Sequence, residues 1–168
     1  MKPDLLNEQV VRDLTEAHYK DREDISPKEI RQATQQVLLN IEAQLNFAYE
    51  LTYLEIKRYC DDFHDGKRSL GDLGEAYGVL SSYVEKPGGS ISARFQLRRP
   101  KLGGGFSKKN LNKDSKEGYA ERTLRRHAQS HEGELAVMTE EHYVRLREQG
   151  KKIKETRRKL RTIKLFPK

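Results

Sequence analysis

The chain has 168 residues, of which 35% are hydrophobic and 35% are charged, and its formal net charge is +7. This composition suits one folded domain but is too polar for a thick core, so we expect a thin, elongated body or a homo-oligomer. No apolar run approaches the ~20 residues of a membrane span, and Met1–Val10 lack the pattern of a secretory signal. The single cysteine, Cys60, excludes an intramolecular disulfide and fits the cytoplasmic location that we expect.

The two signs of charge are segregated along the chain. Residues 1–93 hold 11 Lys and Arg against 17 Asp and Glu, a net of −6, whereas residues 94–168 hold 22 against 9, a net of +13. A mixed surface would keep a protein in solution without this division, so the asymmetry indicates a polyanionic partner for the second part. The alternative is a solvated surface that has no partner.

Two helices are predicted in the acidic part. Apolar residues recur at helical spacing over 4–20, and Asp4 can cap the start. The run from Ser26 to Glu29 is a capping box with proline at the first helical position, and it predicts a helix over 27–64, roughly 55 Å long. The apolar stripe of this helix consists of Ile30, Ala33, Val37, Ile41, Leu45, Ala48, Thr52, Ile56, Tyr59 and Phe63.

The hydrophobic period then changes from helical to that of a strand. Four glycines within 66–78 predict a loop or a short irregular helix. Three strands are expected after it, over 77–84, 90–99 and 106–113, joined by glycine-containing turns. The middle strand alternates between an apolar and a polar face: Ile91, Ala93, Phe95 and Leu97 against Ser92, Arg94, Gln96 and Arg98. We predict an antiparallel sheet with one face on the long helix and a basic face outward.

A basic helix is predicted over 121–164, either continuous or with a break near Gly133. Residues 145–168 hold eleven Lys and Arg against two Glu. The predicted fold is α+β and mostly α: a single domain, 1–168, of long helices packed with a small basic antiparallel sheet of two or three strands. Its parts are an acidic helical half (1–64), the sheet (77–113) and the basic helix. The apolar stripe of that helix is Leu124, Ala128, Leu135, Met138, His142, Leu146, Ile153, Leu160 and Ile163.

The clustered cations are the candidate functional residues. Phosphates along a duplex form a dense line of negative charge, and Lys and Arg that release their counterions bind it. Arg94, Gln96 and Arg98 share one strand face and could read bases, or they could be ordinary exposed residues; contact with the nucleic-acid backbone is the interpretation that we adopt. The predicted nucleic-acid-binding residues are Arg94, Arg98, Arg99, Lys101, Lys108, Lys109, Lys113, Arg125, Arg126, Lys151, Lys154, Arg157, Arg158 and Arg161.

Two other partners remain open for these cations. They could dock on an acidic protein, which would make the chain a helical adaptor, or they could bind RNA. RNA recognition needs exposed aromatic side chains for base stacking, whereas Tyr83, Phe95 and Phe106 fit a core. We therefore rank double-stranded DNA first and expect no membrane partner.

The sequence has no pattern of a catalytic or metal site. Gly103 to Gly105 lack the remainder of a phosphate-binding loop, and the acidic residues are not clustered as a nuclease needs. His127 with His131, and Cys60 with His64, are pairs one helical turn apart, but structural zinc takes four ligands. We predict a protein that is not an enzyme and has no cofactor or metal.

Several runs together carry a resemblance to a known family. They are 53–57 (Tyr-Leu-Glu-Ile-Lys), 116–119 (Lys-Glu-Gly-Tyr), 134–147 with its Thr-Glu-Glu-His-Tyr, and 157–161 (Arg-Arg-Lys-Leu-Arg). Over roughly residues 50–165 the chain resembles the MobI-like auxiliary mobilisation proteins of conjugative plasmids and integrative elements. The resemblance implies a cytoplasmic relaxosome accessory protein that is needed to start DNA transfer at an origin of transfer. Such a protein would act with a relaxase or another transfer protein and would not cut DNA itself.

Overall fold

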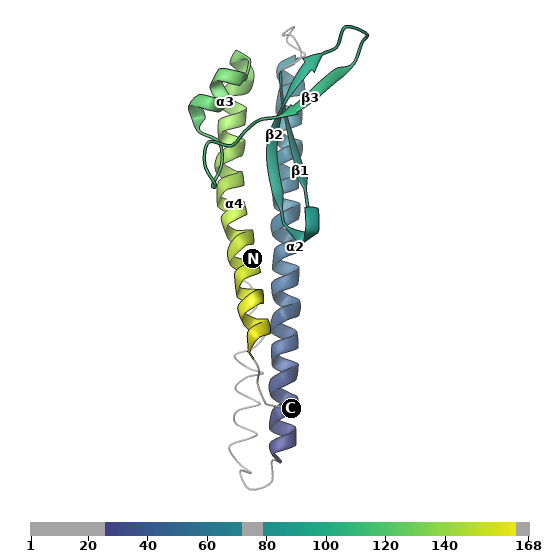
Figure 1. Cartoon of the computed structure of the whole chain (residues 1–168), viewed down its shortest axis with the longest axis vertical. Coiled ribbons are helices and arrows are strands. Elements are labelled where there is room, and N and C mark those ends of the chain that lie inside the picture. Colours follow the sequence, from purple (N-terminus) through teal and green to yellow (C-terminus); the bar gives the residue numbers. More distant parts are fainter. Residues whose placement is uncertain (1–25, 72–78, 164–168) are drawn as a thin grey trace.

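The computed structural model describes residues 26–71 and 79–163; the helix predicted over 4–20 lies outside them. Two long helices lie side by side, with a small sheet and a short helix packed along them (Figure 1). The fold is α+β and mostly helical, as the sequence predicts. In chain order the elements are the helix α2 (Pro27–Gly71), the strand β1 (Leu80–Glu85), the 3-10 turn η1 (Pro87–Gly89), the strands β2 (Ser92–Pro100) and β3 (Phe106–Asn110), and the helices α3 (Glu121–His127) and α4 (Ser130–Thr162).

The helix α2 begins at the predicted capping box and ends later than predicted. The Glu29 amide donates to Ser26 Oγ at 3.3 Å, and the Ser26 amide donates to the Glu29 carboxylate at 2.8 Å. The helix then continues to Gly71, so the predicted end at residue 64 and the start of the predicted loop at 66 are wrong. Gly66 lies inside this helix, at a point where α4 packs close to it. A Cβ on Gly66 would lie 3.3 Å from the Leu135 side chain, so the absence of a side chain lets the two helices approach.

The apolar stripe predicted for α2 is buried only in its C-terminal half. Ile56 and Phe63 have almost no exposed surface, whereas Ile30 and Val37 are 52% and 49% exposed. The change follows from the length of α4, whose last described turn lies beside Glu42. From there toward its own N-terminus, α2 has no neighbour among the described helices and strands (Figure 1).

The three strands form an antiparallel sheet in the order β1-β2-β3. The turn between β1 and β2 places Gly88 and Gly89 at φ of 55° and 75°, a region that favours glycine. The predicted alternation of β2 is confirmed, since Ala93, Phe95 and Leu97 are buried while the residues between them face the other way. The sheet therefore has one apolar inner face and one polar outer face.

The core lies between the inner face of the sheet and the two long helices. Phe95 of β2 meets Phe63 of α2 edge to face, with ring centroids 5.6 Å apart. Tyr119 and Tyr143 also contact Phe95, at 5.5 and 6.0 Å. The Tyr143 hydroxyl lies 2.6 Å from Ser82 Oγ, and burial raises the pKa of this tyrosine well above its usual range. This cluster fixes the sheet against α2 and α4.

The C-terminal region forms two helices, as the prediction of a break near Gly133 allows, and the break lies at 128–129. The Gln129 amide donates to the Glu132 carboxylate at 3.1 Å, which starts α4 at Ser130. The buried Gly133 lies inside α4. The break at 128–129 allows α3 to fold back against the first turns of α4.

The buried face of α4 also differs from the predicted stripe. Met138 and Ile163 were expected in the core but are 55% and 51% exposed. Two carboxylates take part in the interior instead, because each has a cation and backbone amides as partners. The buried residues of α4 are Glu132, Gly133, Ala136, Thr139, Glu140, Tyr143, Leu146 and Gly150. Among the described helices none is long and apolar enough to cross a membrane.

Candidate nucleic-acid interface

The tip of the β2–β3 hairpin extends beyond β1 as a two-stranded ribbon (Figure 1). β1 pairs with β2 only as far as Leu80 opposite Leu97, whereas β2 and β3 stay paired to Pro100 opposite Phe106. The loop at the tip is closed by the Lys101 amide, which donates to the Gly105 carbonyl at 3.1 Å. Such a ribbon has the dimensions that fit a groove of duplex DNA.

Both faces of this ribbon carry cations. Arg98 lies directly opposite Lys108 on the outer face, and the Arg98 guanidinium stacks 4.5 Å from the ring centroid of Phe106. Lys109 pairs with Leu97 and therefore points to the other face, on the same side as Arg99. The sequence contains no Asp or Glu between Glu85 and Asp114, so the ribbon itself holds cations and no carboxylate.

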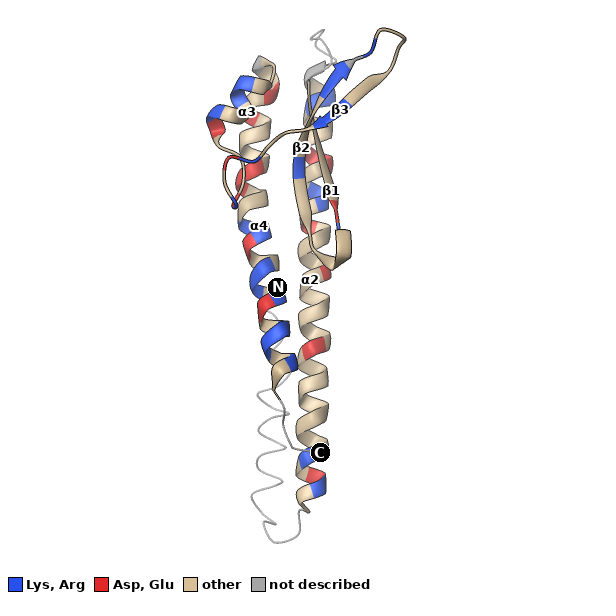
Figure 2. Cartoon of the chain, viewed as in Figure 1, with Lys and Arg blue, Asp and Glu red and all other residues tan. Residues whose placement is uncertain are grey.

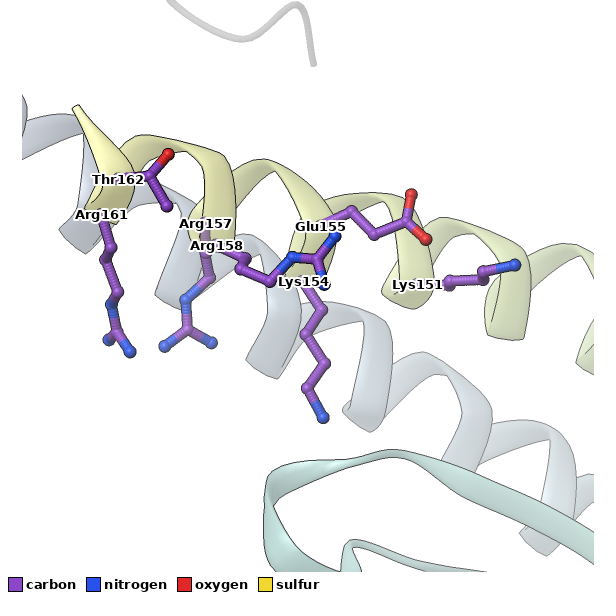
Figure 3. A pocket seen from close by; sticks show the side chains of 7 residues that line it. All are labelled: Lys151, Lys154, Glu155, Arg157, Arg158, Arg161 and Thr162. Carbon is purple, nitrogen blue, oxygen red and sulfur yellow. The ribbon is translucent and has the colours of Figure 1, made fainter.

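A second group of cations lies on the C-terminal half of α4. Lys151, Lys154, Arg158 and Arg161 follow one another at steps of three, four and three, so they line one side of the helix. They border a hollow of about 580 Å³, together with Arg157, Thr162 and one carboxylate, Glu155. Figure 3 shows Lys154, Arg157 and Arg161 extending to the same side of α4.

The cations of α4 differ in how they are held. Lys154 donates to Ser90 Oγ, and the Arg161 guanidinium pairs with Glu42 of α2 at 2.5 Å. Arg157 is half-buried, and its Nε has no hydrogen-bond partner among the described residues. Lys151 and Arg158 are exposed and form no ion pair within the described part of the chain. These side chains retain charge that a ligand could neutralise.

Lys113 connects the sheet to α4. Burial lowers the pKa of Lys113, and the positive charges of Arg147 and Arg94 lower it further, while the Glu140 charge raises it. Arg147 of α4 in turn donates to the Ala93 carbonyl of β2 at 3.0 Å, so this part of α4 lies level with the lower part of β2.

In Figure 2 blue segments mark Lys and Arg along the ribbon, β2 and the lower part of α4. Twelve of the predicted residues lie on these elements and on the segment that follows β3, and together we call them the basic track. At 3.3 Å per residue in β2 and 1.5 Å in α4 it is roughly 45 Å long. The basic track consists of Arg94, Arg98, Arg99, Lys101, Lys108, Lys109, Lys113, Lys151, Lys154, Arg157, Arg158 and Arg161.

A buried ion pair fixes the middle of the basic track. Glu140 and Arg147 lie two turns apart on α4, their side chains are 5% and 12% exposed, and they form a salt bridge. Glu140 accepts from the Tyr119 amide at 2.9 Å, and Arg147 donates to the Glu117 carbonyl at 2.7 Å. Burial raises the pKa of Glu140, against the opposing effect of the Arg147 charge. The pair joins α4 to β2 and to the segment that follows Lys113.

Gly118 is the residue that allows this arrangement. A Cβ on Gly118 would overlap the Glu140 carboxylate and the Arg147 guanidinium. Only glycine therefore fits against the buried pair. Gly118, Tyr119, Glu140 and Arg147 belong to the family motifs in the sequence, but nothing in those motifs predicted that the four residues meet. The available signal was an acidic and a basic residue seven apart on the apolar side of a helix.

A second buried pair, also missed from the sequence, holds the start of β1. The Glu132 carboxylate lies 2.5 Å from the Lys67 ammonium, with side-chain exposures of 0% and 8%. Glu132 also accepts from the amides of Val79 and Leu80, at 2.9 and 3.2 Å. Since β1 pairs with β2, this contact sets the position of β2 and hence of the ribbon.

A family model described as MobI protein matches residues 55–161, which is more than half of the chain. The chain belongs to the MobI family. MobI proteins are accessory mobilisation proteins, so this chain is a mobilisation-related protein. No curated protein and no solved structure matches it.

The MobI match contains both buried pairs and the whole basic track. Two of the predicted nucleic-acid-binding residues, Arg125 and Arg126, are within the match but not within the track. They lie on α3, where Arg125 pairs with Glu121 at 2.6 Å. α3 packs beside the first turns of α4, at a distance from the cations near its end (Figure 1).

Cys60, His64 and His142 of this MobI chain have structural contacts. His64 lies 2.8 Å from the Ser82 carbonyl, and His142 stacks on Tyr59 with ring centroids 3.9 Å apart. Cys60 is buried, and this burial raises the pKa of its thiol. Within residues 26–71 and 79–163, no three His, Cys, Asp or Glu side chains come together as metal ligands would.

Proposed function

We propose that the chain is a non-catalytic, double-stranded DNA-binding accessory protein of conjugative transfer. The observation that carries this proposal is the basic track, which gathers twelve cations along one elongated body. Its length of roughly 45 Å exceeds one turn of a duplex, about 34–36 Å. Membership of the MobI family supports the biological setting, in which the protein acts in the cytoplasm with a relaxase at an origin of transfer.

Contact with phosphates explains the arrangement of the track better than the reading of bases. Several of the outer-face side chains already have partners: Arg94 donates to Ser92 Oγ, and Gln96 donates to Asn110, both at 2.8 Å. Arg98 is stacked on Phe106. Side chains held in this way still present positive charge, but they are less free to make the bidentate contacts that identify a base.

Fluorescence anisotropy with labelled duplex DNA tests the proposal. Six to eight phosphate contacts imply a slope of log affinity against log salt of roughly −5 to −7. We expect this slope, and we expect unlabelled duplex to compete better than single-stranded DNA or RNA. A slope near zero would refute DNA binding and favour an adaptor that docks on an acidic protein, and better competition by RNA would favour an RNA-binding protein.

The action with a relaxase is tested separately. Purified relaxase would be incubated with a supercoiled plasmid that carries the origin of transfer, with and without this protein. We expect the protein to increase the nicked fraction and to cause no nicking when the relaxase is absent. Nicking by the protein alone would contradict the non-catalytic assignment.

A further inference from the structure

One face of α2 is apolar and has no covering element among the described residues. Phe47 is 66% exposed, Leu51 49% and Leu54 57%. They follow one another at steps of four and three and therefore lie on one side of the helix. The elements that pack on α2 use other residues: Gly150 of α4 lies near Tyr49 and Thr52 on the buried face.

We propose that this face, Phe47, Leu51 and Leu54, is where a second copy of the chain docks, with the two α2 helices antiparallel. Three large apolar side chains at neighbouring positions are more than the scattered exposed residues of an ordinary monomer surface. A two-fold pairing buries the same patch on both copies. The inference does not depend on DNA binding.

The charges that flank the face favour the antiparallel arrangement. With the two-fold axis between Glu50 and Leu51, Phe47 of one copy lies level with Leu54 of the other, and Arg58 lies level with the neutral Ala43. In a parallel pair each residue would lie level with its own copy. Arg58, which lies near the centre of the face, would then approach Arg58, and such a like-charge contact is unfavourable. The two Glu50 side chains lie near the two-fold axis of the antiparallel pair, where each is paired with Lys86 of its own copy.

The size of the face sets the strength of the dimer. Contact from Leu39 to Asp62 would extend over about 36 Å of helix, at 1.5 Å per residue. On a helix about 10 Å across this is a strip of roughly 360 Å² on each copy. That is below the ~1,200 Å² in total that marks stable specific interfaces. We therefore expect a reversible dimer whose population rises with protein concentration.

Sedimentation equilibrium of the full chain tests the dimer. The wild-type mass should rise from 19.6 kDa toward twice that value as the concentration increases. Phe47→Glu and Leu51→Glu should remain at the monomer mass. Met138→Glu is the matched control, because Met138 is equally exposed at 55% but lies on α4; this variant should associate like the wild type.

Two results would overturn the proposal. One is a wild-type chain that stays monomeric at every concentration. If Phe47→Glu also lowers the melting temperature of that monomer, the face is covered by residues of the same chain and not by a second copy. The other is a Leu51→Glu variant that associates as the wild type does. Circular dichroism of each variant checks that its helices remain folded, and an unchanged affinity of Leu51→Glu for a short duplex would separate this proposal from that of DNA binding.

The orientation is tested by cross-linking with a short bismaleimide in a Cys60→Ser background. Copies with Phe47→Cys should cross-link efficiently to copies with Leu54→Cys, and each variant alone should cross-link weakly to itself. The reverse pattern would exclude the antiparallel arrangement.

Discussion

At the scale of single residues, the interior of this protein is notable for its charges. Glu140 with Arg147, and Glu132 with Lys67, are buried beside aromatic and aliphatic side chains. A buried carboxylate is tolerated when it has a cation and amide donors, and both glutamates have them. Each pair also joins elements that are distant in the sequence, so the pairs position β1, β2 and α4 relative to one another.

Gly118 gives the first prediction at this scale. Replacing Gly118 with Ala should lower the free energy of unfolding by roughly 2–4 kcal/mol, because the added methyl group must displace the buried pair. Gly103→Ala is the control, since a Cβ there meets no atom within 4 Å and the change should stay within about 0.5 kcal/mol. Urea unfolding measures both, and equal stabilities would show that the Glu140–Arg147 pair is not a fixed part of the fold.

At the scale of elements, the ribbon and the end of α4 have different roles in the proposed interface. Arg99, Lys108 and Lys109 of the ribbon are exposed and Arg98 is half-buried against Phe106. The cations of α4 are partly engaged with Ser90 and Glu42. The ribbon is thus the part of the basic track that can enter a groove, and α4 is the part that can follow the duplex backbone.

Lys108 and Lys109 of the ribbon are expected to contact DNA phosphates. Replacing both Lys108 and Lys109 with Gln should make the salt slope of DNA binding less steep by about 2, since each lost phosphate contact removes about 0.9. Stability should be unchanged because both side chains are exposed. Arg125→Gln with Arg126→Gln, on α3, removes the same charge outside the basic track and should leave the slope as it is. An equal effect of both double variants would mean that only net charge matters.

At the scale of the whole molecule, the two proposals together determine the form of the DNA site. In the antiparallel dimer the cations of α4 lie near the two-fold axis, because Arg161 contacts Glu42 and Gly150 lies near Tyr49. The ribbons lie at the two ends, since Lys67 donates to the Leu80 carbonyl beside the ribbon. With about 25 Å from the axis to the level of Lys67, the ribbons are roughly 50 Å apart.

A two-fold dimer with this spacing should bind an inverted repeat. Hydroxyl-radical footprinting should give protection that is symmetric about its centre and covers at least about 15 base pairs, at 3.4 Å each. The monomeric variant Leu51→Glu should protect half of that length. An asymmetric wild-type footprint, or one that Leu51→Glu does not shorten, would show that the dimer does not bind the DNA as a unit.

The sequence by itself determined the features that depend on neighbouring residues. The capping box at Ser26, the turn at Gly88 and Gly89, and the alternation around Phe95 each involve residues a few positions apart, so local geometry decides them. The family motifs and the segregation of charge were visible for the same reason, because both are properties of the linear chain.

Only the tertiary structure decided which surfaces are buried and which cations lie together. α2 has apolar residues on several sides, so the spacing of apolar residues along the sequence could not show which side is buried. In the structure Ile56 faces the core and Phe47 faces outward. Glu140 is buried, and Met138 exposed, because Arg147 and the Tyr119 amide meet that carboxylate in the fold. The basic track is continuous for a similar reason: packing brings Lys113 near Arg94 and Arg147, and long-range contacts of this kind leave no periodic pattern in the sequence.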